Sequence, residues 1–258
     1  MNGKLMDMNA KLQTAIKNVF SPLASLGLLA FAGQAAALDV TVIHGINGTD
    51  LGLDEALPVD ISANGNCIAE GVTFRTQANV ADLIGQNLEP GQYTIEIHLS
   101  DANSFDGCTG ALAVTSQVPL QLAENTTLIA HLSEAGTPTL SKFVNNVQPI
   151  EHGKARLSVR HTAAAPHVKL VGFPDRARYA TLFLDLTNGS GKTADIPSGN
   201  TNVYLRDNQT GIAPRGAARR QALLTPIIPV TIADEKAIAA YAVGSAKNGS
   251  LELIVQEL

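Results

Sequence analysis

The order of short sequence landmarks in the first half of the chain recurs in its second half. A strand-like run that ends in His44 is matched by one that ends in His161. "PVDI" is followed by "EPGQYTIEI", just as "HVKL" is followed by "IPSGNTNVYL". Matched positions lie about 110 residues apart, a period typical of tandem modules. The repeat predicts two modules, over residues 38–148 and 154–258, joined by a polar linker over 149–153.

Each module has the sequence pattern of a β domain. Short strand-like runs such as "YTIEIHLS" alternate apolar and polar residues, and turn signals such as Asn64-Gly65 separate them. Pro90-Gly91 is typical of the centre of a type II turn, in which the glycine has a positive φ. No sustained helical period occurs after residue 37. We therefore expect an all-β chain of two tandem immunoglobulin-like antiparallel β-sandwich domains, with a small barrel as the alternative for each module.

The N-terminal 37 residues differ in composition from the rest. Lys4, Lys11 and Lys17 precede a short apolar run, and small residues follow it up to Ala37. A basic segment, an apolar core and an A-x-A end are typical of a secretory signal peptide. We expect cleavage after about Ala37 and a secreted or periplasmic protein whose mature chain has no transmembrane segment. An uncleaved anchor is the alternative.

Cys67 and Cys108 are the two cysteines of the chain. In an oxidising compartment two cysteines are expected to pair. We predict a disulfide between them, with free thiols as the alternative.

His44 and His161 recur at the end of matched strands. A histidine there can donate from one ring nitrogen to a loop carbonyl and accept a backbone N–H at the other. We predict that both act as structural loop clamps, with ligand binding or catalysis as the alternative. His161 and His167 flank one loop, but the first module has no counterpart of His167, so we expect no metal and no cofactor.

The landmarks quoted above carry a family resemblance. "VIHG…LPVDIS…LEPGQYTIEI" and "VRHTAAAPHVKL…IPSGNTNVYL" resemble domain-of-unknown-function family 4397 in two consecutive copies. The second copy departs from the pattern at Lys169, where an Asp is usual, and at Asn202, where a Tyr is usual. The resemblance implies secreted or surface-attached bacterial β domains, often in tandem. It implies no catalytic residue, because the family has no assigned activity.

Charge is distributed unevenly between the modules. Residues 38–150 contain two basic residues and thirteen acidic ones, whereas residues 151–258 contain thirteen basic and nine acidic. The candidate contacts for an anionic partner are four arginines, Arg206, Arg215, Arg219 and Arg220. The modules could dock within one chain, associate head to tail between chains, or leave the arginines for an anionic envelope polymer. Nucleic acid is not an expected partner, because the chain is acidic overall and poor in aromatic residues.

No motif of a known hydrolase or metalloenzyme is present. The chain lacks G-x-S-x-G and H-E-x-x-H, and the absence of Trp disfavours a sugar-stacking platform. We therefore expect a non-catalytic protein for cell-surface or envelope binding, adhesion or self-assembly. The alternative is a polysaccharide-active or metal-dependent enzyme, or an enzyme accessory, that uses the histidine-bearing loops.

Overall fold

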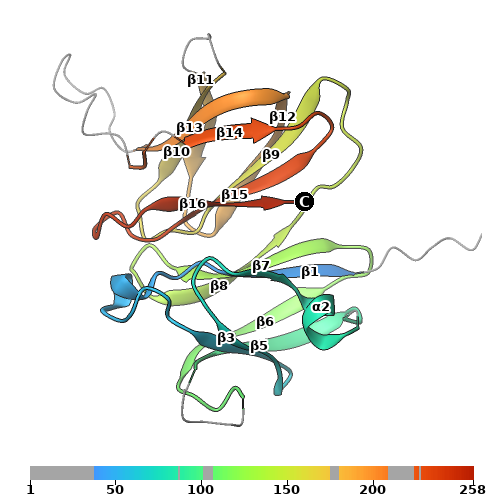
Figure 1. Ribbon diagram of the computed structural model, residues 1–258, viewed down its shortest axis with the longest axis vertical. Coiled ribbons are helices and arrows are strands. Elements are labelled where there is room, and N and C mark those ends of the chain that lie inside the picture. The colour runs from blue at the N-terminus through green and yellow to red at the C-terminus, as the bar shows by residue number, and fades with distance from the viewer. Residues whose placement is uncertain (1–37, 87, 101–106, 175–179, 209–223, 227) are drawn as a thin grey trace, which may run out of the picture. The chain divides into compact units, whose positions relative to one another are not determined.

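The structure is a computed structural model that describes residues 38–258, except 87, 101–106, 175–179, 209–223 and 227. The predicted signal peptide and Arg215, Arg219 and Arg220 lie outside the described residues. Ala36–Leu258 form one compact unit. The part of this unit that the structure describes is almost entirely β structure, as the sequence predicted (Figure 1).

Strands β1 to β8 form two four-stranded sheets. Their order is β4-β1-β7-β8 in one sheet and β3-β2-β5-β6 in the other. The strands are β1 (Asp39–His44), β2 (Val59–Ala63), β3 (Asn66–Val72), β4 (Gln77–Asn79), β5 (Gly91–Leu99), β6 (Leu112–Leu120), β7 (Asn125–Leu132) and β8 (Pro138–Val144). A 3-10 turn, η1 (Gly48–Leu51), and a short helix, α2 (Val80–Ile84), lie between strands. We refer to β1–β8 as the first module.

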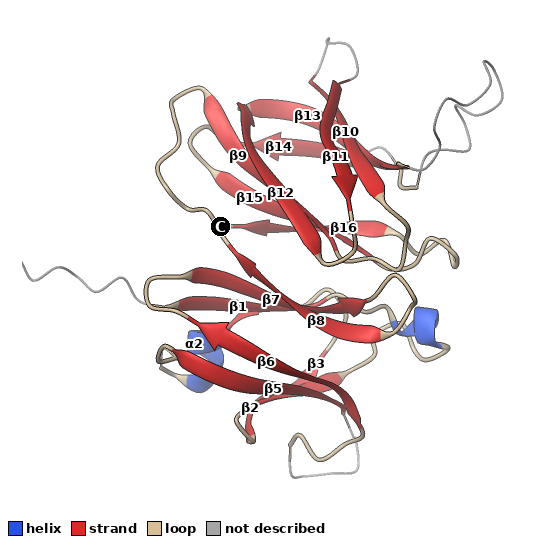
Figure 2. Cartoon of the chain, turned by 180° about the vertical axis from the view of Figure 1, so that it is seen from behind, coloured by secondary structure: helices blue, strands red, loops and turns tan. Residues whose placement is uncertain are grey.

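Strands β9 to β16 repeat this arrangement. Their sheets have the orders β12-β9-β15-β16 and β11-β10-β13-β14, which are the first module's orders with eight added to each strand (Figure 2). The strands are β9 (Lys154–His161), β10 (Val168–Pro174), β11 (Ala180–Leu186), β12 (Ser190–Pro197), β13 (Gly199–Asp207), β14 (Ile228–Ile232), β15 (Ala237–Val243) and β16 (Glu252–Glu257). We refer to β9–β16 as the second module. The internal repeat of the sequence is thus a repeat of sheet topology.

The local sequence accounts for one hairpin turn, whereas another turn that it predicts is absent. Asn64 and Gly65 both have positive φ, as a two-residue hairpin turn between β2 and β3 requires. The prediction of a type II turn at Pro90-Gly91 was wrong. Gly91 is extended and pairs with Leu120 at the start of β5. The matching Gly199 does have a positive φ, 117°.

Each module contains one parallel strand pair among antiparallel ones. β1 runs parallel to β7, and β9 runs parallel to β15. Every other strand pair in the described sheets is antiparallel, as the sequence predicted. The parallel pairing places the first strand of each module inside its sheet, next to the seventh, rather than at an edge.

Each pair of sheets encloses a separate apolar core. Alternate residues of β1, β2, β5 and β7 fill the first, and alternate residues of β9, β10, β13 and β15 fill the second. A third cluster joins the modules and consists of Ile43, Phe74, Ile129, Ala239, Tyr241, Val243 and Ile254. Strand β15 is consequently buried along its whole length, since one face packs in its own sandwich and the other in the third cluster.

Candidate functional site

His44 is buried at the end of β1 and bonds the loop that follows. Its Nε2 lies 2.8 Å from the carbonyl oxygen of Leu57, and its Nδ1 accepts from the backbone N–H of Ile46 at 3.3 Å. The imidazole is 1% exposed, and burial lowers its pKa. A neutral ring with the proton on Nε2 satisfies both bonds.

His161 repeats this geometry in the second module. Its Nε2 lies 3.0 Å from the carbonyl oxygen of Pro166, and its Nδ1 accepts from the N–H of Ala163 at 3.4 Å. Both accepted N–H groups lie two residues after the histidine. Both carbonyls, those of Leu57 and Pro166, lie two residues before the second strand of their module. Burial lowers the pKa of His161 as well.

This geometry leaves the two rings little capacity for other chemistry. Each imidazole uses both nitrogens within its own module, and His161 is fully buried. His167, the loop neighbour of His161, pairs instead with Asp185, at 2.9 Å between Nδ1 and Oδ1. The structure thus gives His161 and His167 different partners.

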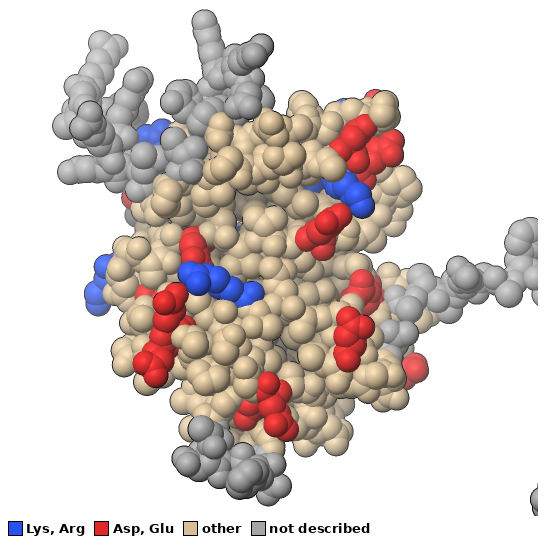
Figure 3. Space-filling view, viewed as in Figure 1, with Lys and Arg blue, Asp and Glu red and all other residues tan. Residues whose placement is uncertain are grey.

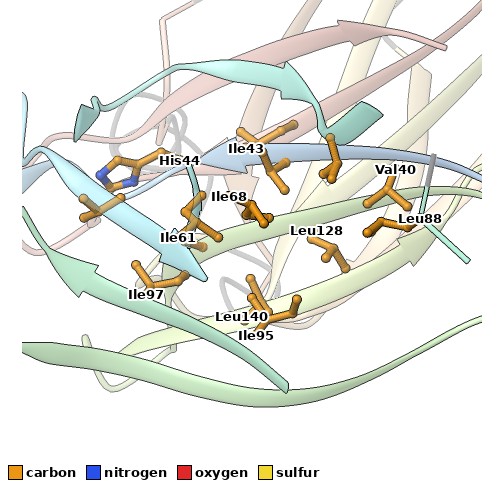
Figure 4. Close-up of a pocket in the computed structure, with 14 residues that line it drawn as sticks. Val40, Ile43, His44, Ile61, Ile68, Leu88, Ile95, Ile97, Leu128 and Leu140 are labelled. Carbon is orange, nitrogen blue, oxygen red and sulfur yellow. The ribbon is translucent and has the colours of Figure 1, made fainter. Parts of the chain in front are cut away.

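A small apolar cavity lies beside His44 in the first core (Figure 4). Its walls are aliphatic side chains from both sheets, including Ile61, Ile97 and Leu128. The space measures about 20 Å³, close to what one water molecule needs. Because its lining is apolar, a cavity of this kind stays dry, and it is too small for an organic ligand.

The predicted disulfide is present. Cys67 and Cys108 are bonded, with Cα atoms 5.6 Å apart. Asp60 holds the same region: its carboxylate accepts from the N–H of Gly71 at 2.9 Å, from the hydroxyl of Ser100 and from the N–H of Cys108 at 3.3 Å. In the sequence Asp60 follows Asp50, Asp54 and Glu55 in an acidic segment, for which we expect a solvated loop rather than a calcium site, but the structure buries Asp60 in β2.

The face between the modules contains a buried arginine. The Arg160 guanidinium lies between two aromatic rings, 4.7 Å from the centroid of Phe143 and 5.0 Å from that of Tyr241. It donates to two neutral oxygens, the hydroxyl of Tyr241 and the side-chain carbonyl of Asn145. The side chain is 3% exposed, and burial lowers its pKa. Aromatic faces attract such a cation where water is excluded.

Hydrogen bonds continue from Arg160 across the interface. The Tyr241 hydroxyl donates to the side-chain oxygen of Gln256, which also accepts from Thr127 of the first module. Asn145 donates to Asn125, and Asn125 donates to Asp39. The sequence does not indicate this network, because the alternation of polar and apolar residues in β9 is typical of a strand with one solvent-exposed face. That face is instead covered by the first module.

The rim of this interface is charged. Arg75 of the first module makes two hydrogen bonds to Glu252 of the second, at 2.7 and 2.8 Å. Asp50 accepts from Asn248 and Ser250. The ion pair takes its cation from the acidic module and its anion from the basic one. The described contacts therefore do not use the opposite net charges of the modules.

The acidic surplus of the first module lies elsewhere on its surface (Figure 3). Figure 3 shows acidic side chains spread over the first module with few basic ones among them. In the second module Arg206 pairs across strands with Lys169, so two cations lie side by side. The Nε of Arg206 is buried and makes no hydrogen bond to a described residue. The structure does not bring Arg206 together with His44 or His161.

Comparisons with known proteins give a family and no activity. The family described as "Domain of unknown function (DUF4397)" matches residues 38–171. No curated protein matches the chain. Among solved structures, "The Bacillus anthracis TIE protein" aligns at a TM-score of 0.26 and 9% identity. That alignment covers 81% of this chain and 34% of the other, so this chain spans about a third of that protein. No helix among the described residues is long and apolar enough to cross a membrane.

Proposed function

The chain belongs to the DUF4397 family, and from that premise we propose that it is a secreted, non-catalytic protein that binds anionic envelope polymers or assembles with copies of itself. One observation carries the proposal. The two modules are packed into one unit through an apolar cluster and a buried polar network, while the sequence gives them opposite net charges and the acidic side chains of the first module are spread over its surface (Figure 3).

Opposite net charges on the two modules favour a charge-driven contact with another molecule. A surface with one sign of charge raises the rate of association with the opposite sign and selects partners. Within one chain the acidic module meets the second module through Arg75 and Glu252, a pair of the reverse polarity. Head-to-tail contact between chains would pair the acidic surplus of the first module with the arginines of the second, and an anionic polymer would neutralise those arginines instead.

The histidine geometry supports a non-catalytic role. General base catalysis requires a ring nitrogen within reach of a substrate proton. The rings of His44 and His161 are buried, and both nitrogens of each are hydrogen-bonded inside the fold. This arrangement favours the scaffold interpretation over the enzyme alternative.

The experiment is sedimentation of residues 38–258, alone and with an anionic polysaccharide, at several salt concentrations. Raising salt from 0.01 M to 1 M shortens the Debye length from roughly 30 Å to roughly 3 Å. We expect complexes at low salt that dissociate at high salt. A strict monomer that binds no anionic polymer at low salt would contradict the proposal.

Two sets of variants separate the two kinds of partner. Replacing Arg206, Arg215, Arg219 and Arg220 with Gln should weaken both self-assembly and polymer binding. Neutralising the exposed acids Asp82, Glu89 and Glu134 of the first module should weaken only self-assembly, because a polymer that binds arginines does not need them. Binding that no set of variants changes would argue against a charge-driven contact.

A further inference from the structure

A histidine and two carboxylates meet at one end of the second module. His152 lies just before β9, and Asp234 and Glu235 form the turn between β14 and β15. The Nδ1 of His152 is 2.8 Å from Oδ2 of Asp234 and 3.4 Å from Oε1 of Glu235. The three ligand atoms all lie within 4.8 Å of one another. Two acids thus converge on one imidazole nitrogen.

A backbone hydrogen bond holds one of these carboxylates in position. The backbone N–H of Gly153 donates to Oδ1 of Asp234 at 2.7 Å, which leaves Oδ2 directed at the ring. Both nearby lysines pair with other acids: Lys154 with Glu151 at 2.6 Å and Lys236 with Glu257 at 3.3 Å. Neither lysine therefore takes the place of a cation between Asp234 and Glu235.

The distances suit a shared metal ion. Zinc binds imidazole nitrogen and carboxylate oxygen at about 2.0–2.2 Å, so neighbouring ligands in a tetrahedron lie roughly 3.3 Å apart. The two measured separations from Nδ1 fall on either side of that value. We propose that His152, Asp234 and Glu235 bind a divalent transition-metal ion of the zinc class, with water in the remaining coordination position.

The first module shows that the fold itself does not produce this set. Its equivalent turn, between β6 and β7, contains Leu122 and Ala123. Ala123 has the same left-handed backbone as Glu235, with φ of 63° and 60° respectively. The same turn conformation therefore occurs with no ligand side chain. The carboxylates are a feature of the second module, where the turn lies beside the segment that joins the modules.

Bound metal would fasten the joining segment to the second module. His152 belongs to that segment, and the turn leads directly into β15, the strand that packs against both modules. A ligand that binds only the folded state stabilises it by mass action. Zinc is thus expected to raise the melting temperature as well as to bind.

The test is isothermal titration of tag-free, chelator-treated residues 38–258 with Zn²⁺, alongside Mn²⁺, Ca²⁺ and Mg²⁺. We expect one Zn²⁺ to bind per chain. His152→Ala and Glu235→Gln should each lower the affinity for zinc roughly tenfold or more. All three side chains are exposed, so the variants should fold and melt as the wild type does without metal.

Two variants serve as controls. Glu89→Gln removes one exposed negative charge of the first module, outside the ligand set, and should leave zinc binding unchanged. His167→Ala removes a second exposed histidine–carboxylate pair, with Asp185, and should also leave it unchanged. The proposal is overturned if millimolar Zn²⁺ does not bind, if binding survives in His152→Ala, or if His167→Ala abolishes it.

Discussion

At the scale of single residues, the buried histidines have the clearest energetic role. His44→Ala leaves the carbonyl of Leu57 and the N–H of Ile46 without their ring partner. A buried polar group that loses its partner costs roughly 1–3 kcal/mol. We expect His44→Ala and His161→Ala each to lower the free energy of unfolding by about 2–3 kcal/mol, measured by urea denaturation.

The exposed His152 provides the control for this prediction. In metal-free buffer His152→Ala should change the free energy of unfolding by less than about 0.5 kcal/mol, as is usual for surface positions. An unchanged stability in His44→Ala and His161→Ala would show that the rings are not clamps. In that case the enzyme alternative would gain support.

The buried histidines also predict loss of stability in acid. Burial lowers the pKa of His131 from 6.5 to about 4, with nearby His161 adding to the effect. The unfolded chain then binds protons more readily than the folded one, so stability is complete above about pH 6.5 and falls as pH falls toward 4. For His131 alone the shift corresponds to about 3 kcal/mol.

This prediction is tested by urea denaturation at a series of pH values between 7 and 4. The free energy of unfolding should fall across that range, and His131→Gln should make the fall shallower. Burial lowers the pKa of His44 and His161 in the same direction, so part of the slope should remain. Equal slopes in the wild type and His131→Gln would contradict the assignment to His131.

At the scale of elements, the sequence predicted where the strands lie better than which strands pair with each other. Alternation and turn residues such as Asn64-Gly65 identify local β structure, since both are properties of adjacent residues. The parallel pairing of β1 with β7 is not local, and no short motif encodes it. The hydrogen bonds expected of His44 and His161 are present, because a strand-end position constrains a ring's nearest partners.

The sequence could not predict that a strand is buried on its polar face as well as on its apolar face. Arg156, Ser158 and Arg160 alternate with apolar residues in β9, a pattern that normally indicates a solvated face. The structure buries that face against the first module. The cluster of His152 with Asp234 and Glu235 was missed for a similar reason, because its members are far apart in the sequence and only the fold brings them together.

The disulfide links β3 to the segment before β6, and we expect it to stabilise the first module. Cys67 lies in β3, and Cys108 lies just before β6, so the bond closes a loop of 41 residues. Such a loop contributes roughly 4 kcal/mol in the chain-entropy model. We expect the double variant Cys67→Ser/Cys108→Ser to remain folded at room temperature with a lower free energy of unfolding.

Reductant separates the disulfide from other effects of this substitution. Dithiothreitol should lower the free energy of unfolding of the wild type by a similar amount and leave that of the double variant unchanged. An equal loss in both proteins would mean that the reagent acts elsewhere. A wild type unaffected by complete reduction would show that the bond contributes little.

At the scale of the whole molecule, the interface makes the two modules one unit. Strands β7, β9 and β15 are buried on both faces, and the third apolar cluster is completed by residues of both modules. Separating the modules would expose Tyr241, which is fully buried, and Arg160 with its ring partners. We therefore expect one cooperative unfolding transition for residues 38–258.

Two arginines of this interface form a matched pair that tests how it is held together. Arg160 is buried, and its removal leaves Asn145 and the Tyr241 hydroxyl without a donor. Arg75 is half-exposed at the rim, where an ion pair such as that with Glu252 is worth about 1 kcal/mol or less. We expect Arg160→Met to lower the free energy of unfolding by about 3 kcal/mol and Arg75→Met by about 1 kcal/mol or less.

Salt dependence distinguishes the two contributions further. The Arg75 effect should shrink between 0.05 M and 0.5 M salt, because exposed charges are screened, and the Arg160 effect should not. Urea denaturation of both variants at the two salt concentrations measures this difference. If both substitutions cost the same and both effects vanish in salt, surface charge holds the modules together. The buried network would then have no energetic role, and the charges that we assign to an outside partner would already be used within the chain.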